Sequence, residues 1–81
     1  MSRKTAAVAF WSRHTRTTPI PTLEKEIMDA PVKEIDRKFL QDACIKKLSY
    51  KELAEKYYRS EKTIYAWKRR LFEKMHSLYG G

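Results

Sequence analysis

The sequence predicts a small all-α protein, a bundle of three to four helices that follows a flexible basic N-terminal arm. The chain has 81 residues, the usual size of one domain. From residue 32 onward, apolar residues recur three and four positions apart, the spacing that lines one face of a helix. Ser49 and Ser60 each precede such a pattern, and a serine hydroxyl can cap the free amides at a helix start.

The arm is predicted over residues 1–21, and residues 22–81 form the helical domain. Threonines and prolines crowd positions 15–21 and disfavour a helix there. Residues 6–13 could form a turn or two of helix, and an alternative reading docks Phe10 and Trp11 on the core. We expect a mostly mobile arm whose two aromatic rings dock lightly on the core.

Two helices are expected in the first half of the domain. Thr22 can cap a short helix over 23–29, and Ala30-Pro31 then ends it. A second helix is expected over 32–47 because its apolar residues have helical spacing. These residues are Val32, Ile35, Phe39, Leu40, Ala43 and Cys44.

Two further helices are expected in the second half. Ser49 and Glu52 form a capping box, so a helix should begin at Tyr50. Ser60 begins a longer one, over about 61–79, whose inward stripe is Ile64, Trp67, Leu71, Met75 and Leu78. A second stripe, Tyr65, Phe72 and Tyr79, suits either core against the N-terminal segment or a homodimer seam, and we favour core.

The segment 48–71 has the pattern of a DNA-binding helix-turn-helix. Ala54 is small enough to let the first helix approach the second, and Ile64 with Trp67 can hold the pair together. The N-terminal half of the second helix then keeps an outward face that can enter a major groove. That face consists of Glu61, Lys62, Thr63, Tyr65, Ala66, Lys68 and Arg69.

Leu53-Ala54, Thr63-Ile64 and Trp67-Lys68-Arg69-Arg70 resemble the helix-turn-helix of bacterial and phage transcription regulators. Over roughly residues 35–78 the chain is similar to region four of sigma factors and to small phage late-gene activators. Terminase small subunits and transposase N-terminal domains use the same local pattern. The resemblance implies DNA binding more specifically than it implies a biological role.

The turn departs from the family pattern. Tyr58 stands where a glycine is usual, and Arg59 stands where a small aliphatic residue is usual. A tyrosine in the left-handed region costs about 1 kcal/mol or more. We therefore expect a turn that is one residue longer or differently wound.

Charge is unevenly distributed along the chain. The formal net charge is +8, with +4 on residues 1–21, zero on 22–48 and +4 on 49–81. A basic surplus in so small a chain favours an anionic partner, usually nucleic acid. We expect base-edge contacts from Glu61, Lys62, Tyr65, Ala66 and Arg69. Phosphate contacts are expected from Lys51, Arg59, Thr63, Lys68 and Arg70, and from Arg3, Lys4, Arg13 and Arg16 of the arm.

The predicted function is sequence-specific binding of double-stranded DNA, as a transcriptional regulator of phage or mobile-element type. One alternative is a protein-interaction module that acts on RNA polymerase through the acid-rich segment 23–42. Another is the DNA-binding subunit of a terminase, transposase or recombination complex. The alternative without DNA binding is an ordinary helical bundle whose basic face is simply solvated. One such unit usually binds DNA weakly, so a homodimer or a partner is expected.

Several classes of function are not expected. The lone Cys44 can form no internal disulfide, and we see no nucleophile–base pair, metal cluster or phosphate loop. The chain is therefore predicted not to be an enzyme and to need no cofactor. It has no apolar run of membrane-spanning length. We expect the protein to be cytoplasmic and associated with the nucleoid, or to be in the host cytoplasm if a phage encodes the protein.

Overall fold

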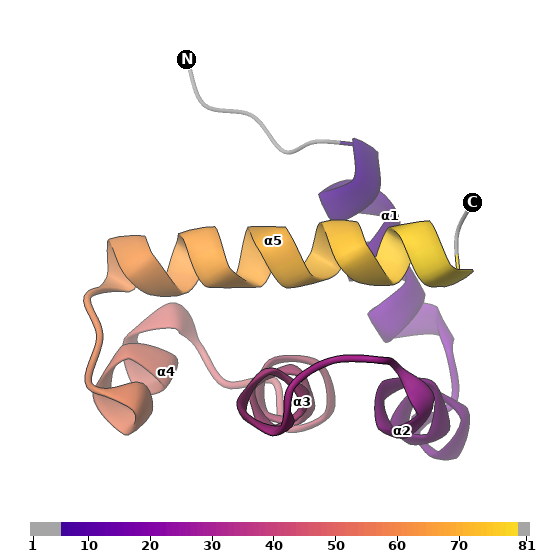
Figure 1. The fold of residues 1–81 in the computed structure, drawn as a ribbon, viewed down its shortest axis with the longest axis horizontal. Coiled ribbons are helices and arrows are strands. Elements are labelled where there is room, and N and C mark those ends of the chain that lie inside the picture. Colours follow the sequence, from indigo (N-terminus) through magenta and orange to yellow (C-terminus); the bar gives the residue numbers. More distant parts are fainter. Residues whose placement is uncertain (1–5, 80–81) are drawn as a thin grey trace.

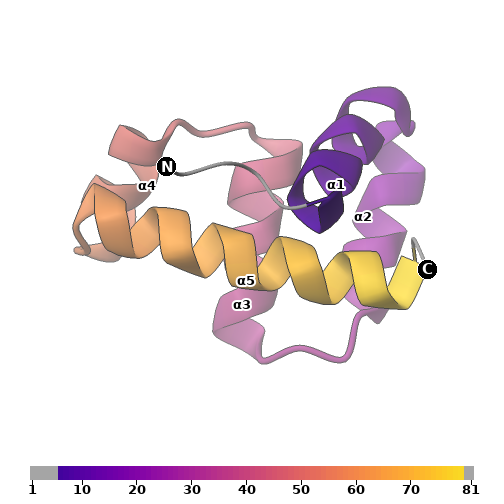
Figure 2. The same cartoon turned by 90° about the horizontal axis from the view of Figure 1, so that it is seen from above.

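A long helix, α5 (Glu61–Tyr79), lies across the molecule in the computed structural model, which describes residues 6–79 (Figure 1). The preceding elements are α1 (Ala6–Thr17), α2 (Ile20–Asp29), α3 (Glu34–Leu40), the π-helical η1 (Gln41–Ile45) and α4 (Tyr50–Tyr57). Helices α2, α3 and α4 lie in a row on one side of α5, and α1 crosses its C-terminal half (Figures 1 and 2). No strand occurs among residues 6–79, so the predicted all-α class is confirmed.

The prediction of a flexible arm is wrong for α1. Trp11 is fully buried, with its ring centre 6.4 Å from that of Phe72 and 6.3 Å from that of Tyr79. Alone, α1 would be marginal, but the apolar surface that it buries on α5 stabilises it. The docking alternative was the correct one. Arg3 and Lys4 lie outside the described residues, so the predicted arm contacts there stay untested.

Two helix starts differ from the predicted ones. Helix α2 begins at Ile20, not after Thr22, because Pro19 and Pro21 suit a first turn in which amide donors have no partners. Helix α3 begins at Glu34 instead of residue 32, and the helical run ends at Ile45. The Arg37 guanidinium holds the extended link before α3 by donating to the Ala30 carbonyl at 3.0 Å.

The core draws on every helix. Its buried members are Trp11, Leu23, Ile27, Ala30, Phe39, Leu40, Cys44, Leu53, Ile64, Leu71, Phe72 and Met75. Phe72 is 2% exposed beneath α1, which confirms core over a homodimer seam for this residue. Ile35 and Leu78, both predicted to face inward, are 49% and 43% exposed. Ile35 lies at the start of α3 and Leu78 at the end of α5. The neighbouring elements cover the middle of each helix and not these ends.

A buried carboxylate ties η1 to α4. Asp42 is 1% exposed, accepts a hydrogen bond from the Tyr57 hydroxyl at 2.6 Å and pairs with the Lys56 ammonium at 2.8 Å. Burial alone would raise the pKa of Asp42, but these two hydrogen bonds and the charges of Lys56 and Lys46 hold it below its ordinary value. Burial, and after it the same carboxylate, raises the pKa of Tyr57 well above its ordinary value. Asp42 therefore fixes α4 against the body of the protein.

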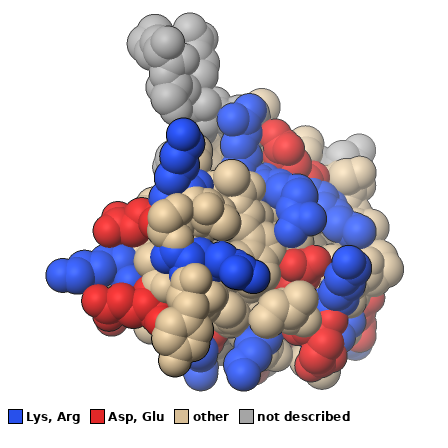
Figure 3. All heavy atoms as spheres, turned by 60° about the vertical axis from the view of Figure 1, so that its left-hand side comes forward, with Lys and Arg blue, Asp and Glu red and all other residues tan. Residues whose placement is uncertain are grey.

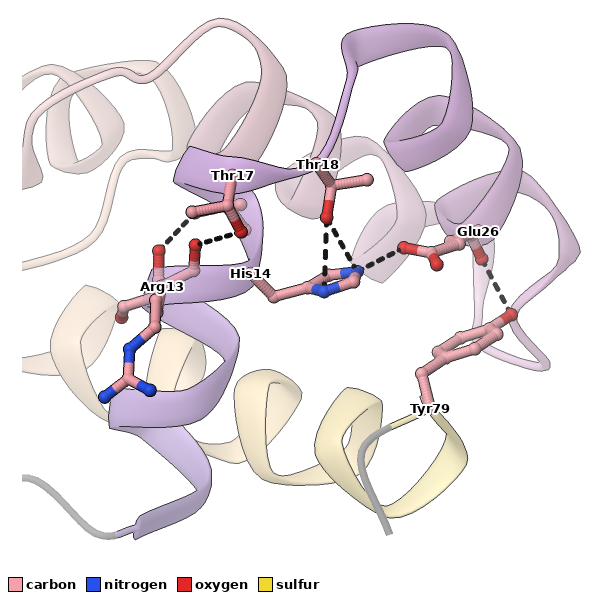
Figure 4. Close-up of polar contacts among 8 residues, drawn as sticks. Arg13, His14, Thr17, Thr18, Glu26 and Tyr79 are labelled. Atoms are coloured by element: carbon pink, nitrogen blue, oxygen red, sulfur yellow. Dashed lines mark hydrogen bonds and ion pairs between the residues drawn. The ribbon is translucent and has the colours of Figure 1, made fainter.

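A polar cluster joins α1, α2 and the end of α5 (Figure 4). His14 is half-buried, with Nε2 2.7 Å from Glu26 Oε1. The Tyr79 hydroxyl donates to the Glu26 carbonyl oxygen at 3.0 Å. These contacts hold both ends of the chain's described part against α2.

Candidate nucleic-acid interface

The first helix of the predicted pair, α4, begins where the sequence placed it. The Glu52 amide donates to Ser49 Oγ at 3.1 Å, and the Ser49 amide donates to Glu52 Oε1 at 2.8 Å. Both bonds of the capping box are therefore present, and the prediction is confirmed. Leu53 is fully buried on the inner side of α4, whereas Lys51 is exposed in its first turn.

The turn between α4 and α5 is short and contains a left-handed tyrosine. Tyr58 has φ 55° and ψ 46°, and the Arg59 amide donates to the Ala54 carbonyl at 3.0 Å to close α4. Ser60 Oγ accepts from the Thr63 amide at 3.2 Å, so the predicted cap is confirmed. The expectation of a longer or differently wound turn was wrong. Tyr58 is 91% exposed, so no neighbouring residue crowds its side chain, and the backbone cost of the left-handed region is the one that remains.

The N-terminal half of α5 keeps one broad face uncovered. Ile64 is fully buried, while the predicted base-contacting residues Glu61, Lys62, Tyr65, Ala66 and Arg69 are all exposed. Arg69 Nε lies 3.6 Å from Glu73 Oε2, and both side chains are about half exposed. Exposed pairs of this kind contribute little, so Arg69 can exchange Glu73 for another acceptor. The predicted base-contacting residues therefore all reach the surface, with the Tyr65 ring packed 5.8 Å from that of Tyr50.

Two basic side chains of α5 lean to opposite sides of that face. Lys68 Nζ lies 4.7 Å from the ring centre of Tyr50 and 5.3 Å from that of Phe72, so it points toward α4 and α1. Arg70 lies on the other side, with a guanidinium nitrogen 3.7 Å from Asp36 Oδ1 of α3. The basic residues of α5 therefore spread over a surface wider than the helix itself.

A hollow of about 480 Å³ opens where α5 faces the start of α3, and we call it the α3 hollow. Four of the predicted DNA-contacting residues line it together: Arg59, Thr63, Ala66 and Arg70. Trp67 also lines it, held by donation from its Nε1 to Asp36 Oδ1 at 2.8 Å. Lys33, which the sequence did not single out, adds a further base. Only the fold brings Lys33 beside α5, and no local pattern marks it.

Two further predicted phosphate contacts lie on α1. Arg13 and Arg16 are exposed on α1. Figure 3 views the end of the molecule formed by α4 and the start of α5, where basic side chains project with acidic ones among them. The surface is therefore of mixed charge, and the placement of particular bases matters more than a uniform field.

Neither metal nor thiol chemistry is indicated in the described part of the chain. No group of three or more His, Cys, Asp or Glu residues among residues 6–79 is placed to hold a metal ion. Burial raises the pKa of the Cys44 thiol to about 11, which keeps it protonated and unreactive. Within the same residues, no helix combines the length and apolarity that crossing a bilayer requires.

Comparisons of the chain with protein-family models, with curated proteins and with solved structures give no match. Any functional conclusion therefore rests on the residues and their geometry.

Proposed function

We propose that this protein binds double-stranded DNA by inserting the N-terminal half of α5 into the major groove. The observation that carries the proposal is the uncovered face of α5, which begins directly after a capped turn of three residues. An α-helix fits a major groove when one side is free and its base-reading side chains lie in the first turns. Lys62, Ala66 and Arg69 give α5 such a side.

The side chains on this face have the chemistry that base edges require. Arg69 and Lys62 can donate to guanine O6 and N7, and Glu61 can accept from the cytosine amino group. Ala66 between them lets the helix approach the bases and can contact a thymine methyl group. Sequence-specific binding, as in a transcriptional regulator, is the use that this combination supports best.

Flanking residues suit contacts with the phosphate backbone. Lys51 is exposed in the first turn of α4, next to Tyr50, which packs on Tyr65 of α5. Arg59 and Arg70 line the α3 hollow on the other side. A groove-bound helix has a phosphate strand on each side, so bases on both flanks can fix its register. Thr63 adds a hydroxyl donor beside Arg59.

Selection of bound sequences from random duplex DNA tests the proposal and yields a site. Binding of that site and of random DNA is then measured by fluorescence anisotropy for Arg69→Ala and Lys62→Ala. Each substitution should weaken specific binding by about 1–3 kcal/mol, roughly 5- to 150-fold, and non-specific binding much less.

Lys74→Ala is the matched control, because Lys74 is an exposed base on the C-terminal half of α5. It should affect specific and random DNA alike. Equal losses on both kinds of DNA for Arg69→Ala and Lys62→Ala would contradict the major-groove assignment. No binding of the parent protein to any duplex at low salt would contradict DNA binding itself.

The α3 hollow supports a second candidate, a protein contact that could involve RNA polymerase. Ile35 and Trp67 give it apolar lining beside the bases Lys33 and Arg59. The acid-rich segment 23–42 is a weaker candidate surface, because four of its acids serve contacts within the fold: Glu26, Glu34, Asp36 and Asp42. Capture of purified polymerase without duplex binding would favour this alternative.

A further inference from the structure

On the side of α5 that faces α1, basic side chains from three separate elements meet at one hollow, here called the α1 hollow. Arg16 of α1, Lys47 of the link before α4 and Lys68 of α5 line its open space of about 260 Å³. Ser12 and Thr15 also line it, and no acidic residue is among the described residues that do so. In a chain with acids dispersed over its surface, this lining is selective for an anion.

The backbone of Lys47 holds its side chain at this place. Lys47 has φ 56°, in the left-handed region where glycine is the usual residue. The Leu48 amide donates to the Asp42 carbonyl at 3.0 Å and closes the helical run around it. Lys47 Nζ then lies 3.3 Å from the Cys44 carbonyl oxygen and 3.4 Å from that of Thr15 in α1. These two contacts are long, and an ammonium has three N–H donors. The Lys47 ammonium can therefore also donate a hydrogen bond to an anion.

The α1 hollow is continuous with the proposed recognition face. A smaller hollow, lined by Tyr50, Tyr65 and Arg69, shares Ser12 and Lys68 with it. The surface therefore runs from Arg69 on α5, past Lys68, to Lys47 and Arg16. Viewed from above, α4 and α1 lie on the same side of α5, toward its two ends (Figure 2).

We propose that the α1 hollow binds backbone phosphates of the same duplex whose major groove receives α5. This inference rests on the proposed function, and it adds a second, rigid phosphate contact from α1 in place of the expected flexible arm. A phosphate oxygen accepts well from both ammonium and guanidinium groups. A backbone strand that leaves the face of α5 along this surface would meet Lys68, Lys47 and Arg16 in succession.

Lys47→Gly and Arg16→Ala test the inference through the salt dependence of binding. The probe is a labelled duplex of about 20 base pairs, at about 3.4 Å each, longer than the protein's 29 Å extent. Each lost phosphate contact should reduce the slope of log K against log salt by about 0.9. Affinity at about 0.1 M salt should fall by about 8-fold, equally for specific and random duplexes.

Two matched controls separate charge from conformation. Among the described residues, Tyr58 shares the left-handed backbone conformation of Lys47, and Tyr58→Gly replaces it without a change of charge. Lys25→Ala removes an exposed base from α2. Both should keep the parent's slope. Lys47→Gly should raise Tm by about 4–8 °C, because glycine relieves the left-handed backbone, so its weaker binding cannot come from unfolding. Arg16→Ala is a surface change that leaves the core intact.

The outcomes are distinct. Parent-like slopes for both Lys47→Gly and Arg16→Ala, in a protein that binds duplex DNA, would overturn this inference and leave the role of α5 intact. A parent protein that binds no duplex at low salt would instead overturn the proposed function, and this inference with it.

Discussion

The two halves of α5 have the same amphipathic pattern but different surroundings. In the C-terminal half, Leu71, Phe72 and Met75 are all buried, because α1 packs along this part of the helix. In the N-terminal half, only Ile64 is buried, and the opposite side stays open. One half thus belongs to the core, and the other presents a surface.

This difference shows how so small a chain can both stabilise a helix and expose it. In proteins, tertiary packing of an amphipathic face supplies most of the stability of a helix. In the N-terminal half, α4 and α3 pack on the inner side through Ile64 and Trp67, which leaves the outer side exposed. The capped turn at Ser60 and the Asp42 link to α4 then fix where the exposed half begins.

The largest effect, a loss of stability centred on the C-terminal half of α5, is expected from Trp11→Ala. Removal of a fully buried tryptophan should cost about 3–5 kcal/mol. A domain of this size has about 4–12 kcal/mol in total, so much of the stability would be lost. Urea denaturation followed by circular dichroism measures the loss, and hydrogen exchange should show it first in the C-terminal half of α5. Leu78→Ala, at a 43% exposed site, is the control and should cost less than about 1 kcal/mol.

Asp42→Asn should have the next largest effect, on the placement of α4. The substitution removes the charge that pairs with Lys56, at a cost of about 2–3 kcal/mol, since hydrogen bonds to charged groups contribute about 1.5–3 kcal/mol. The folded pKa of Asp42 is lowered, so its stabilisation is complete above the unfolded pKa near 3.8 and is lost as pH falls through the folded value. Denaturation across this acid range should show a flatter pH dependence for the variant. If the variant lost stability with falling pH as steeply as the parent does, the role given to Asp42 would be contradicted.

Sequence patterns anticipated α4 and α5 well because local rules dominate there. The capping box at Ser49 and the cap at Ser60 need only residues three positions apart, and both are present. The patterns failed for α1 because its stability comes from Trp11 packing on Phe72, 61 positions away along the chain. The same limit hid Asp42, whose partners Tyr57 and Lys56 lie in another helix. Exposure of the candidate face was predictable, whereas the gathering of Arg16, Lys47 and Lys68 was not.

Asp36→Asn should separate stability from binding in the exposed half. Asp36 accepts from Trp67 Nε1 at 2.8 Å and lies 3.7 Å from the Arg70 guanidinium. An amide oxygen can still accept from Trp67, so the cost should be only about 1 kcal/mol. Loss of the negative charge should release Arg70 and tighten duplex binding several-fold at low salt, with a steeper salt slope. Glu34→Gln, which changes another acid of α3, is the control and should leave binding unchanged.

The smallest effect is expected from Tyr58→Gly, at the turn that begins the exposed half. Glycine removes the left-handed penalty of about 1 kcal/mol, so Tm should rise by about 4–8 °C. The Tyr58 side chain is 91% exposed and has no part in the proposed groove contacts, so duplex affinity should stay the same. Thermal denaturation and anisotropy with the selected site measure both quantities. A stabler variant that bound the site less tightly would show that the tyrosine itself contacts DNA, and the recognition face would then extend from α5 into the turn.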